Sequence, residues 1–263
     1  MEHIDDVGRT VRLDRPATRV VSLCPSVTET LFALKLQDEV VGRTRFCVHP
    51  AGEVKRAQNV GGTKKVDESR IDALQPDLIL AVKEENTPEI IAALETRYPV
   101  YVFDVRTPDD ALRMIGQIGA MCDRESEAAK LVEEIRLRLS RMTPVSLRYA
   151  YLIWESPTMA VGGDTFIDSL LQEAGWENVL STADVHYPTI NPEEIRACQP
   201  DVVFLSSEPY PFKEQHISRY KALYPECDVR LIDGEISWFG AHMRQSLDQL
   251  AALNEQIRKR QAY

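Results

Sequence analysis

The chain has 263 residues, of which 44% are hydrophobic and 27% are charged. This composition is typical of a folded globular protein and excludes a disordered or fibrous chain. The 31 basic and 41 acidic residues give a net charge of −10, which repels phosphate backbones and anionic lipids. We therefore expect neither nucleic acid nor a membrane surface as the main partner, and the length favours two lobes over one.

The five cysteines lie far apart, and no two of them have the C-x-x-C spacing of a zinc or redox site. We expect free buried thiols, which are typical of a reducing compartment. The first six residues are acidic and lack an apolar stretch, so we expect no secretory signal in the chain. The localisation stays open: periplasmic or cell-envelope if a leader was removed, cytoplasmic if Met1 is the native start.

The first part of the chain alternates short apolar runs with helical segments. Pro25 ends the first run, and we expect Ser26 or Thr28 to cap the helix that follows it. Strands separated by helices need crossover connections, which predicts a largely parallel sheet. The predicted strands cover residues 19–23, 40–42, 78–82 and 100–104, and the predicted helices include residues 71–75 and 88–96.

Residues 108–142 form a long helical stretch without internal proline. Gly116, Gly119 and the charged residues 123–125 predict one break near its middle, after which a helix of about 25 Å covers residues 126–142. A second series of strands and helices follows. We predict strands at residues 149–154, 202–206 and 229–233, and helices at residues 165–174 and 244–259.

The two series of strands match each other, which predicts an internal duplication. Residues 71–80 align with residues 195–204, with half of the ten positions identical, and residues 30–41 and 100–104 have counterparts at 169–180 and 229–233. We therefore expect an α/β fold of two lobes with like topology. The N-terminal lobe covers residues 1–107, a linking helical segment residues 108–143 and the C-terminal lobe residues 144–263.

The offset between the copies falls from 139 to 124 residues, so the first lobe holds 15 additional residues between Val41 and Ile71. Ligands of parallel α/β sheets bind beyond the carboxyl ends of the strands, and insertions there often carry ligand contacts. Aromatic residues at such ends suit a large planar or hydrophobic ligand. The candidate residues are Ser26, Phe46 and His49 in the first lobe, and Trp154, Tyr187, Tyr210, Trp238, Phe239 and His242 in the second half.

These candidates have other interpretations. Trp154 and Trp238 could instead pack between sheet and helix at the rim. Cys47 and His49 could form a soft metal pair, but two ligands do not close a site, and we expect no metal site built by the chain alone. An axial imidazole on a metal held by a macrocycle needs one histidine, and His49, His186 and His242 are candidates.

No catalytic template is present. The sequence lacks a G-x-S-x-G elbow, a Walker-type loop, a G-x-G-x-x-G turn after a strand and an H-E-x-x-H motif. This pattern favours a binding protein over an enzyme. The alternative is a chelatase-like protein that acts on a tetrapyrrole metal, in which His242 with Glu155 or Glu208 would supply acid–base groups.

The chain resembles the helical-backbone metal receptors, the substrate-binding proteins of ABC transporters for cobalamin, haem and ferric siderophores. The resemblance extends from about residue 11 to residue 257 and is strongest to the cobalamin-binding branch. It rests on R-V-V-S-L-C-P-S-V-T-E at residues 19–29, L-Q-P-D at residues 74–77, Q-P-D at residues 199–201 and S-W-F-G-A-H at residues 237–242.

This resemblance implies two Rossmann-like lobes joined by one rigid helix, with the ligand held in a cleft between them. It implies a monomer that binds a corrinoid, haem or ferric siderophore, has no intrinsic cofactor and delivers its ligand to an ABC permease. A cytoplasmic corrinoid or haem carrier that uses the same cleft is the second possibility.

The resemblance also assigns roles to single residues. Phe46 matches an aromatic cleft position, and Trp238 with Phe239 matches the opposite wall. Arg244 resembles a basic residue near that wall, with a spacing one residue shorter, and Thr63 stands where some relatives have a tryptophan. Permease-docking carboxylates match Glu193 in the second lobe and, in the first, Ser69 with Glu68 beside it.

Overall fold

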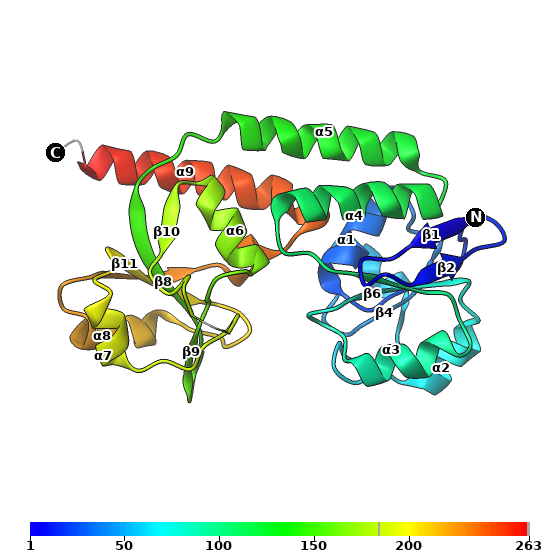
Figure 1. Ribbon diagram of the computed structural model, residues 1–263, viewed down its shortest axis with the longest axis horizontal. Helices are drawn as coiled ribbons and strands as arrows, with labels where there is room; N and C mark the ends of the chain where they lie inside the picture. Colours follow the sequence, from blue (N-terminus) through cyan, green and yellow to red (C-terminus); the bar gives the residue numbers. More distant parts are fainter. Residues whose placement is uncertain (184, 262–263) are drawn as a thin grey trace. The chain divides into compact units, whose positions relative to one another are not determined.

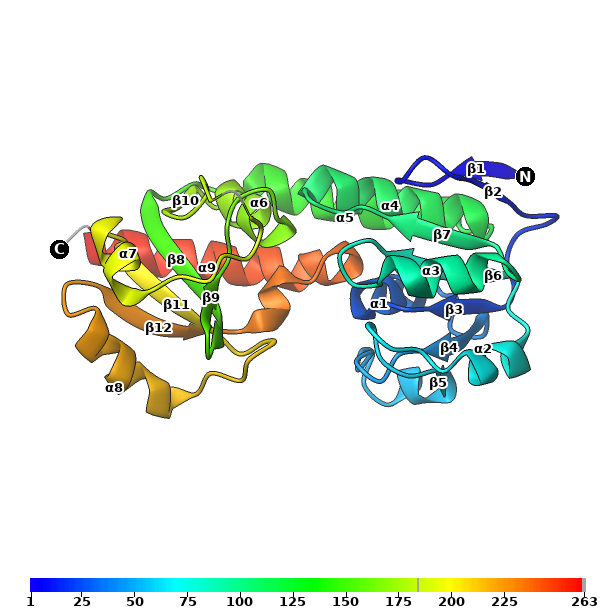
Figure 2. The same cartoon turned by 60° about the horizontal axis from the view of Figure 1, so that its bottom comes forward.

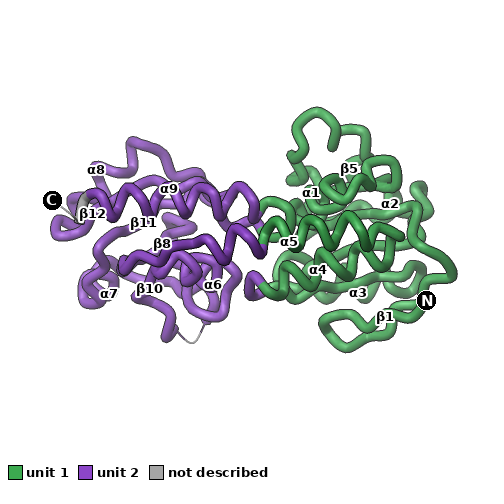
Figure 3. Tube along the Cα trace, turned by 90° about the horizontal axis from the view of Figure 1, so that it is seen from above, with its two compact units in different colours: residues 1–105, 109–135, 239–242 green, residues 106–108, 136–238, 243–263 purple. Residues whose placement is uncertain are grey.

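The computed structural model describes residues 1–183 and 185–261. The chain forms two compact units, shown in different colours in Figure 3. Unit 1 comprises Met1–Val105, Asp109–Ile135 and Phe239–His242, and unit 2 comprises Arg106–Pro108, Arg136–Trp238 and Met243–Tyr263. Each unit is an α/β fold with its own sheet and apolar core. No helix in the described part of the chain is long and apolar enough to cross a membrane.

Unit 1 is built on a parallel sheet with the strand order β5-β4-β3-β6-β7; Figure 1 labels its strands β4 and β6, and Figure 2 labels all five. The interior strand β6 (Leu78–Val82) is buried along its whole length, as expected for a sheet covered on both faces. The other strands are β3 (Val20–Ser22), β4 (Val40–Arg43), β5 (Gln58–Asn59) and β7 (Val100–Phe103). The helices that follow the strands are α1 (Pro25–Ala33), the 3-10 turn η1 (Glu53–Arg56), α2 (Glu68–Leu74) and α3 (Pro88–Glu95).

Unit 2 has a second parallel sheet, with the order β10-β8-β11-β12 and the short strand β9 antiparallel on β8 (Figure 2). Its strands are β8 (Leu147–Glu155), β9 (Thr158–Ala160), β10 (Trp176–Asn178), β11 (Val202–Ser206) and β12 (Asp228–Ile232). Its helices include α6 (Phe166–Glu173), α7 (Pro192–Ala197), α8 (Glu214–Leu223), the 3-10 turn η2 (Gly234–Ser237) and α9 (Met243–Gln261).

The order of the strands confirms that the two units have the same topology. The run β4-β3-β6-β7 in unit 1 corresponds to β10-β8-β11-β12 in unit 2, strand for strand. The aligned Gln-Pro-Asp segments also share an unusual backbone. Gln75 and Gln199 both have a left-handed conformation, with φ of 46° and 49°, directly before the proline of each segment.

The aspartates of these segments make equivalent hydrogen bonds. The Asp77 carboxylate accepts from the backbone N–H of Arg19 at 2.8 Å, and the Asp201 carboxylate accepts from that of Arg148 at 2.7 Å. Each arginine also donates through its guanidinium to a backbone carbonyl at the end of the helix that precedes the Gln-Pro-Asp segment. Arg19 donates to the end of α2, and Arg148 donates to the end of α7. The duplication therefore extends from the sequence motif to the contacts that join helix, turn and strand.

The start of α1 differs from the sequence-based expectation. The capping of α1 by Ser26 or Thr28 is wrong, because the helix already begins at Pro25, and Cys24 occupies the N-cap position without a side-chain hydrogen bond. Proline suits the first helical position, where its missing N–H has no intrahelical partner to lose. Thr28 instead lies inside the helix, with its Oγ1 2.8 Å from the Oγ of Ser22.

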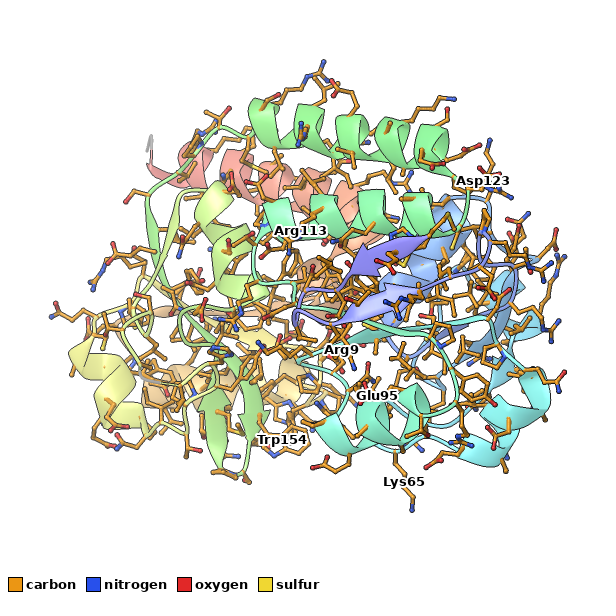
Figure 4. All side chains as sticks on the ribbon, turned by 45° about the vertical axis from the view of Figure 1, so that its right-hand side comes forward. Arg9, Lys65, Glu95, Arg113, Asp123 and Trp154 are labelled. Atoms are coloured by element: carbon orange, nitrogen blue, oxygen red, sulfur yellow. The ribbon has the colours of Figure 1, made fainter. Side chains whose placement is uncertain are left out.

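The predicted single break in the long helical stretch is confirmed, and it lies beside the charged residues 123–125. Helix α4 (Pro108–Met121) continues through Gly116 and Gly119, and Asp123, with a φ of 56°, separates it from α5 (Glu125–Arg141) (Figure 4). Gly119 is needed for packing, because a Cβ there would lie 2.6 Å from the Cβ of Ala128 on α5. The boundary between the units falls within α5, after Ile135.

An N-terminal hairpin in unit 1 was not expected from the sequence. Strands β1 (Glu2–Ile4) and β2 (Thr10–Arg12) pair antiparallel, and the buried Asp5 accepts hydrogen bonds from the Arg9 backbone and guanidinium. Arg9 also forms an ion pair with Glu95 of α3 (Figure 4). The hairpin is held by polar contacts, which hydrophobic periodicity does not reveal.

Candidate ligand-binding site

The loop after β4 presents an aromatic side chain at the carboxyl edge of the sheet in unit 1. Its anchor is Cys47, which is buried with its Sγ 3.0 Å from the Thr28 Oγ1 and 3.2 Å from the Thr44 Oγ1. The neighbours of this anchor, Phe46 and Val48, are 47% and 48% exposed. Exposed large apolar side chains beside a fixed anchor are typical of a binding surface.

The Cys47 thiol is suited to anchoring rather than to metal binding. Burial raises its pKa and raises that of the nearby Cys24 well above the ordinary value, so both remain protonated, whereas thiolate is the metal-binding form. In the described ranges of the chain, no group of three or more His, Cys, Asp or Glu side chains could hold a metal ion.

A short segment from the second half of the sequence completes this part of unit 1. The 3-10 turn η3 (Gly240–His242) packs against α1, and the backbone N–H of Ala241 donates to the Thr30 Oγ1 at 3.0 Å. Gly240 has a φ of 72°, and a Cβ there would lie 2.2 Å from the same Thr30 oxygen. Phe239, one of the predicted site residues, belongs to this segment.

His242 lies in a buried polar cluster. Its Nδ1 is 2.9 Å from a carboxylate oxygen of Glu29, both residues are buried, and its ring centroid is 5.9 Å from that of His49. If neutral His242 donates from Nδ1 to Glu29, its Nε2 becomes the acceptor. Sequence reasoning selected both histidines but missed Glu29, which stands at the end of the first motif and 213 residues from His242.

Ser26 is the least accessible of the predicted site residues in unit 1. It lies in the first turn of α1 and is 4% exposed, and its carbonyl accepts a hydrogen bond from the Thr30 hydroxyl. A ligand could reach only a small part of this side chain, whereas Phe46 is half exposed, with the Arg45 guanidinium over its ring at 4.8 Å from the centroid.

In unit 2, Trp154 and Tyr210 form an aromatic corner at the carboxyl end of β8. Their ring centroids are 5.7 Å apart with an interplanar angle of 68°, an edge-to-face geometry that stabilises aromatic pairs. Trp154 is 40% exposed and donates through Nε1 to the Ser156 carbonyl at 3.2 Å. Trp154 belongs to the hairpin of β8 and β9 and is labelled in Figure 4.

A carboxylate behind this corner fixes the tyrosine. The Tyr210 hydroxyl donates to Glu155, which also pairs with the Arg219 guanidinium at 2.5 Å. The hydrogen bond to the Glu155 carboxylate is the main reason why the pKa of Tyr210 is raised. Glu155 thus acts as a support for the aromatic ring, a role that the sequence did not indicate.

Trp238 is held by a second carboxylate. It follows η2, and its indole Nε1 donates to a carboxylate oxygen of Glu208 at 3.1 Å. Glu208 follows β11, and the turn that carries it passes so close to η2 that a Cβ on Gly234 would lie 2.8 Å from the Glu208 nitrogen. Glycine at position 234 therefore permits the approach that brings these two side chains together.

The remaining predicted residues of unit 2 lie near other charged groups. Tyr187 is next to His186, whose Nε2 is 3.3 Å from a carboxylate oxygen of Asp164. Arg244 is in the first turn of α9 and is half-buried. The two sets of predicted residues thus divide between the units, and their meeting in one cleft stays a prediction.

The two predicted docking glutamates lie at the starts of corresponding helices. Glu68 opens α2 after the N-cap Asp67, and Glu193 is in the first turn of α7 after the N-cap Asn191. Both carboxylates are exposed and form ion pairs, Glu68 with Arg97 at 2.5 Å and Glu193 with a neighbouring arginine of α7 at 2.7 Å. Surface pairs of this kind contribute little to stability.

Comparison with known proteins agrees with this architecture. The family model described as periplasmic binding protein matches residues 20–223. A vitamin B12-binding protein of Vibrio parahaemolyticus is 30% identical over 201 residues, which cover 73% of this chain and 72% of the relative. One of Pectobacterium carotovorum is 24% identical over 229 residues, covering 84% and 81%.

Solved structures share the fold at lower sequence identity. The periplasmic vitamin B12 binding protein of Vibrio cholerae has a TM-score of 0.76 at 21% identity, covering 93% of this chain and 99% of that one. A periplasmic heme binding protein of Pseudomonas aeruginosa has a TM-score of 0.77 at 19% identity, covering 90% and 92%. The expected two-lobed fold and the expectation of a binding protein rather than an enzyme are thereby confirmed. From the length of the family match and the identity to its relatives, the chain belongs to the periplasmic binding protein family.

Proposed function

We propose that this protein is the substrate-binding component of an ABC-type importer, and that its ligand is a metal-bearing macrocycle or chelate, with a corrinoid such as cobalamin as the first candidate. The observation that supports it most is the presence of exposed aromatic side chains at the carboxyl edges of both sheets. Phe46 in unit 1 and Trp154 in unit 2 are each about half exposed although they lie next to buried strand segments.

Aromatic side chains of this kind match the chemistry of a large planar ligand. Stacked and edge-to-face contacts with a conjugated ring bury apolar area on both partners, and each good aromatic pair contributes about 0.5–1.5 kcal/mol beyond the area that it buries. Trp238 and Tyr210 are fixed by hydrogen bonds to Glu208 and Glu155. Rings that are already fixed lose little conformational entropy when the ligand binds.

The names of the relatives point to the same ligand class. The curated relatives are vitamin B12-binding proteins, and the structural neighbours include heme-binding proteins and an Fe3+-hydroxamate transport protein. We place the ligand in a cleft between the two units, with residues 108–143 as the helical link. The protein would act as a monomer outside the inner membrane and present Glu68 and Glu193 to the permease.

The test is a fluorescence titration with cyanocobalamin, haemin and a ferric hydroxamate. We expect one of these ligands, cyanocobalamin first, to quench tryptophan emission with saturation near one ligand per chain. N-acetyltryptophanamide at equal absorbance serves as the inner-filter control. Trp154→Phe and Trp238→Phe should each reduce the quenching, because a ligand bound beside both indoles quenches both.

The outcome that contradicts the proposal is equally clear. If none of the three ligands changes the corrected emission, and none is retained in equilibrium dialysis, then the protein is not a receptor for this class of chelate. Quenching that is lost in a variant of the buried Trp176 alone would place the ligand away from the carboxyl edges.

A further inference from the structure

The segment that follows β4 in unit 1 carries a charge opposite to that of the whole chain. Residues 43–66 contain six basic side chains and one acidic side chain, Glu53, so the segment has a net charge of +5 in a chain whose net charge is −10. The six basic residues are Arg43, Arg45, Lys55, Arg56, Lys64 and Lys65. Within the described part of the chain none of the six forms an ion pair, whereas the basic residues on either side of the segment, Lys35 and Arg70, both do. Positive charge that the protein does not neutralise attracts an anion.

Arg45 is the member of this set that lies against an expected ligand contact. Its guanidinium carbon is 4.8 Å from the centroid of the Phe46 ring, which is a cation–π contact. The Arg45 side chain is exposed, and Phe46 is 47% exposed. A ligand that contacts the exposed part of Phe46 therefore comes within reach of the Arg45 guanidinium.

A turn of the same segment holds the two side chains in place. The backbone N–H of Arg45 donates to the Gly61 carbonyl at 2.7 Å. A Cβ on Gly62 would lie 3.3 Å from the Phe46 Cε2 and 3.5 Å from a guanidinium nitrogen of Arg45, so the turn packs against both side chains. A side chain that is already held in this way loses less conformational entropy when a ligand binds.

The Arg45 guanidinium keeps its hydrogen-bond donors for a ligand, whereas other cations of the segment do not. Arg43 donates to the Val54 carbonyl at 3.2 Å. Lys64 donates to the Glu84 carbonyl at 2.6 Å. Among the residues that the structure describes, the Arg45 side chain has the contact with the Phe46 ring and no hydrogen bond to a carbonyl or carboxylate. Its planar fork of N–H groups matches the two oxygens of a carboxylate or a phosphate.

We propose that Arg45 is a specificity-determining residue that binds an anionic group, a phosphate or a carboxylate, at the rim of the ligand that contacts Phe46. Hydrogen bonds between a guanidinium and an oxyanion are about twice as strong as those between neutral groups. The unpaired basic residues of the same segment add attraction at longer range. This inference rests on the proposed function, and two of the ligand classes named there supply such a group, the phosphodiester of cobalamin and the propionates of haem.

The closing experiment uses two pairs of ligands that differ only in the anion. Cobinamide and cobinamide phosphate share the corrin ring and differ by one phosphate, whereas haemin and its dimethyl ester share the porphyrin and differ in the two carboxylates. In equilibrium dialysis we expect the wild-type protein to bind the anionic member of one pair about tenfold or more tightly than the other member. Arg45→Gln should bring that ratio to about twofold or less, because the amide carries no charge and has no matching fork. The pair that responds identifies the anion as a phosphate or a carboxylate.

Two controls separate the contact from general charge and from folding. Arg56→Gln removes the same charge from the exposed end of η1 in the same segment, and it should leave the ratio within about twofold of the wild-type value. If Arg45→Gln fails to fold, the wild-type protein still gives a test. Its preference for the anionic ligand should decrease as salt is raised, because salt screens the attraction between exposed charges. A preference that salt does not change would overturn the proposal.

The possible failures are distinguishable. If both members of each pair bind the wild-type protein equally well, the role of Arg45 is refuted while the receptor function stands. The same conclusion follows if Arg45→Gln retains the wild-type ratio, or if Arg56→Gln lowers it as much. If none of the four ligands binds, the assignment to a corrinoid or haem is overturned together with the role of Arg45.

Discussion

Gly240 is a position in unit 1 that has no room for one added methyl group. Its φ of 72° lies in the left-handed region, and a Cβ there would be 2.2 Å from the Thr30 Oγ1 and 2.9 Å from the Met114 Cε. The left-handed conformation costs a non-glycine residue about 1–2 kcal/mol, and overpacking costs about 1–3 kcal/mol more. We therefore expect Gly240→Ala to lower the free energy of unfolding by about 2–5 kcal/mol.

Urea denaturation followed by circular dichroism measures this change. Gly116→Ala is the matched control, because Gly116 lies in α4 and, apart from the backbone of its own helix and its chain neighbours, no atom is within 4 Å of the place that an added methyl group would take. Alanine there should stabilise the protein by about 0.5–1 kcal/mol. Thr30→Ala in the Gly240→Ala background should recover part of the loss, since it removes the overlapping oxygen. A Gly240→Ala loss below about 0.5 kcal/mol would refute this account of how η3 packs on α1.

Three further predictions concern unit 2 and the buried thiols. Asn254 is 1% exposed and accepts the Trp176 indole N–H at 2.7 Å, so Asn254→Leu leaves a buried donor without acceptor and should cost about 1–3 kcal/mol in urea unfolding. Burial raises the pKa of Cys122 from 9.0 to about 12. The stabilisation that comes from keeping this thiol protonated is therefore complete below pH 9 and is lost as pH rises toward 12. Between these pH values the free energy of unfolding should fall by up to about 1.4 kcal/mol per pH unit because of Cys122, and Cys122→Ala should remove this part of the pH dependence. Glu155→Gln should lower the pKa of Tyr210, measured from tyrosinate absorbance against Tyr210→Phe, and an unchanged titration would show that their hydrogen bond is absent in solution.

Local sequence patterns were sufficient to predict the main parallel strands of both sheets and most helices. The expected bounds of β6 and β11, residues 78–82 and 202–206, agree with the structure. These apolar runs are preceded by Pro-Asp, which ends a helix and supplies a carboxylate to the neighbouring strand. Helix α6 was also predicted closely, because Thr165 caps it and Gly175 follows its end.

Features that depend on distant polar contacts were not predictable. The β1–β2 hairpin rests on the buried Asp5 and on an ion pair between Arg9 and Glu95, 86 residues apart. Helix α8 has a weakly amphipathic sequence, Glu214–Leu223, and gave no periodic signal. Hydrophobic periodicity indicates which side of a single helix or strand faces the core of the protein. It carries little information about polar contacts between residues far apart in the sequence.

In the candidate site, too, local patterns identified some residues and missed those that act through distant contacts. Position after a strand was enough to select Phe46, Trp154 and Trp238, because the carboxyl ends of parallel strands share one edge of the sheet. The supporting carboxylates, Glu29 for His242 and Glu208 for Trp238, come from elements far away in the sequence. Only the folded chain identifies which carboxylate supports which ring.

The central claim is that one ligand contacts aromatic residues of both units. Isothermal titration calorimetry of cyanocobalamin against the wild-type protein, Phe46→Ala in unit 1 and Trp238→Ala in unit 2 tests it most directly. We expect one ligand per chain and a loss of affinity of about tenfold or more in each variant. Binding that is weakened in one variant and unchanged in the other would show that the ligand is held by a single unit, and it would contradict the claim.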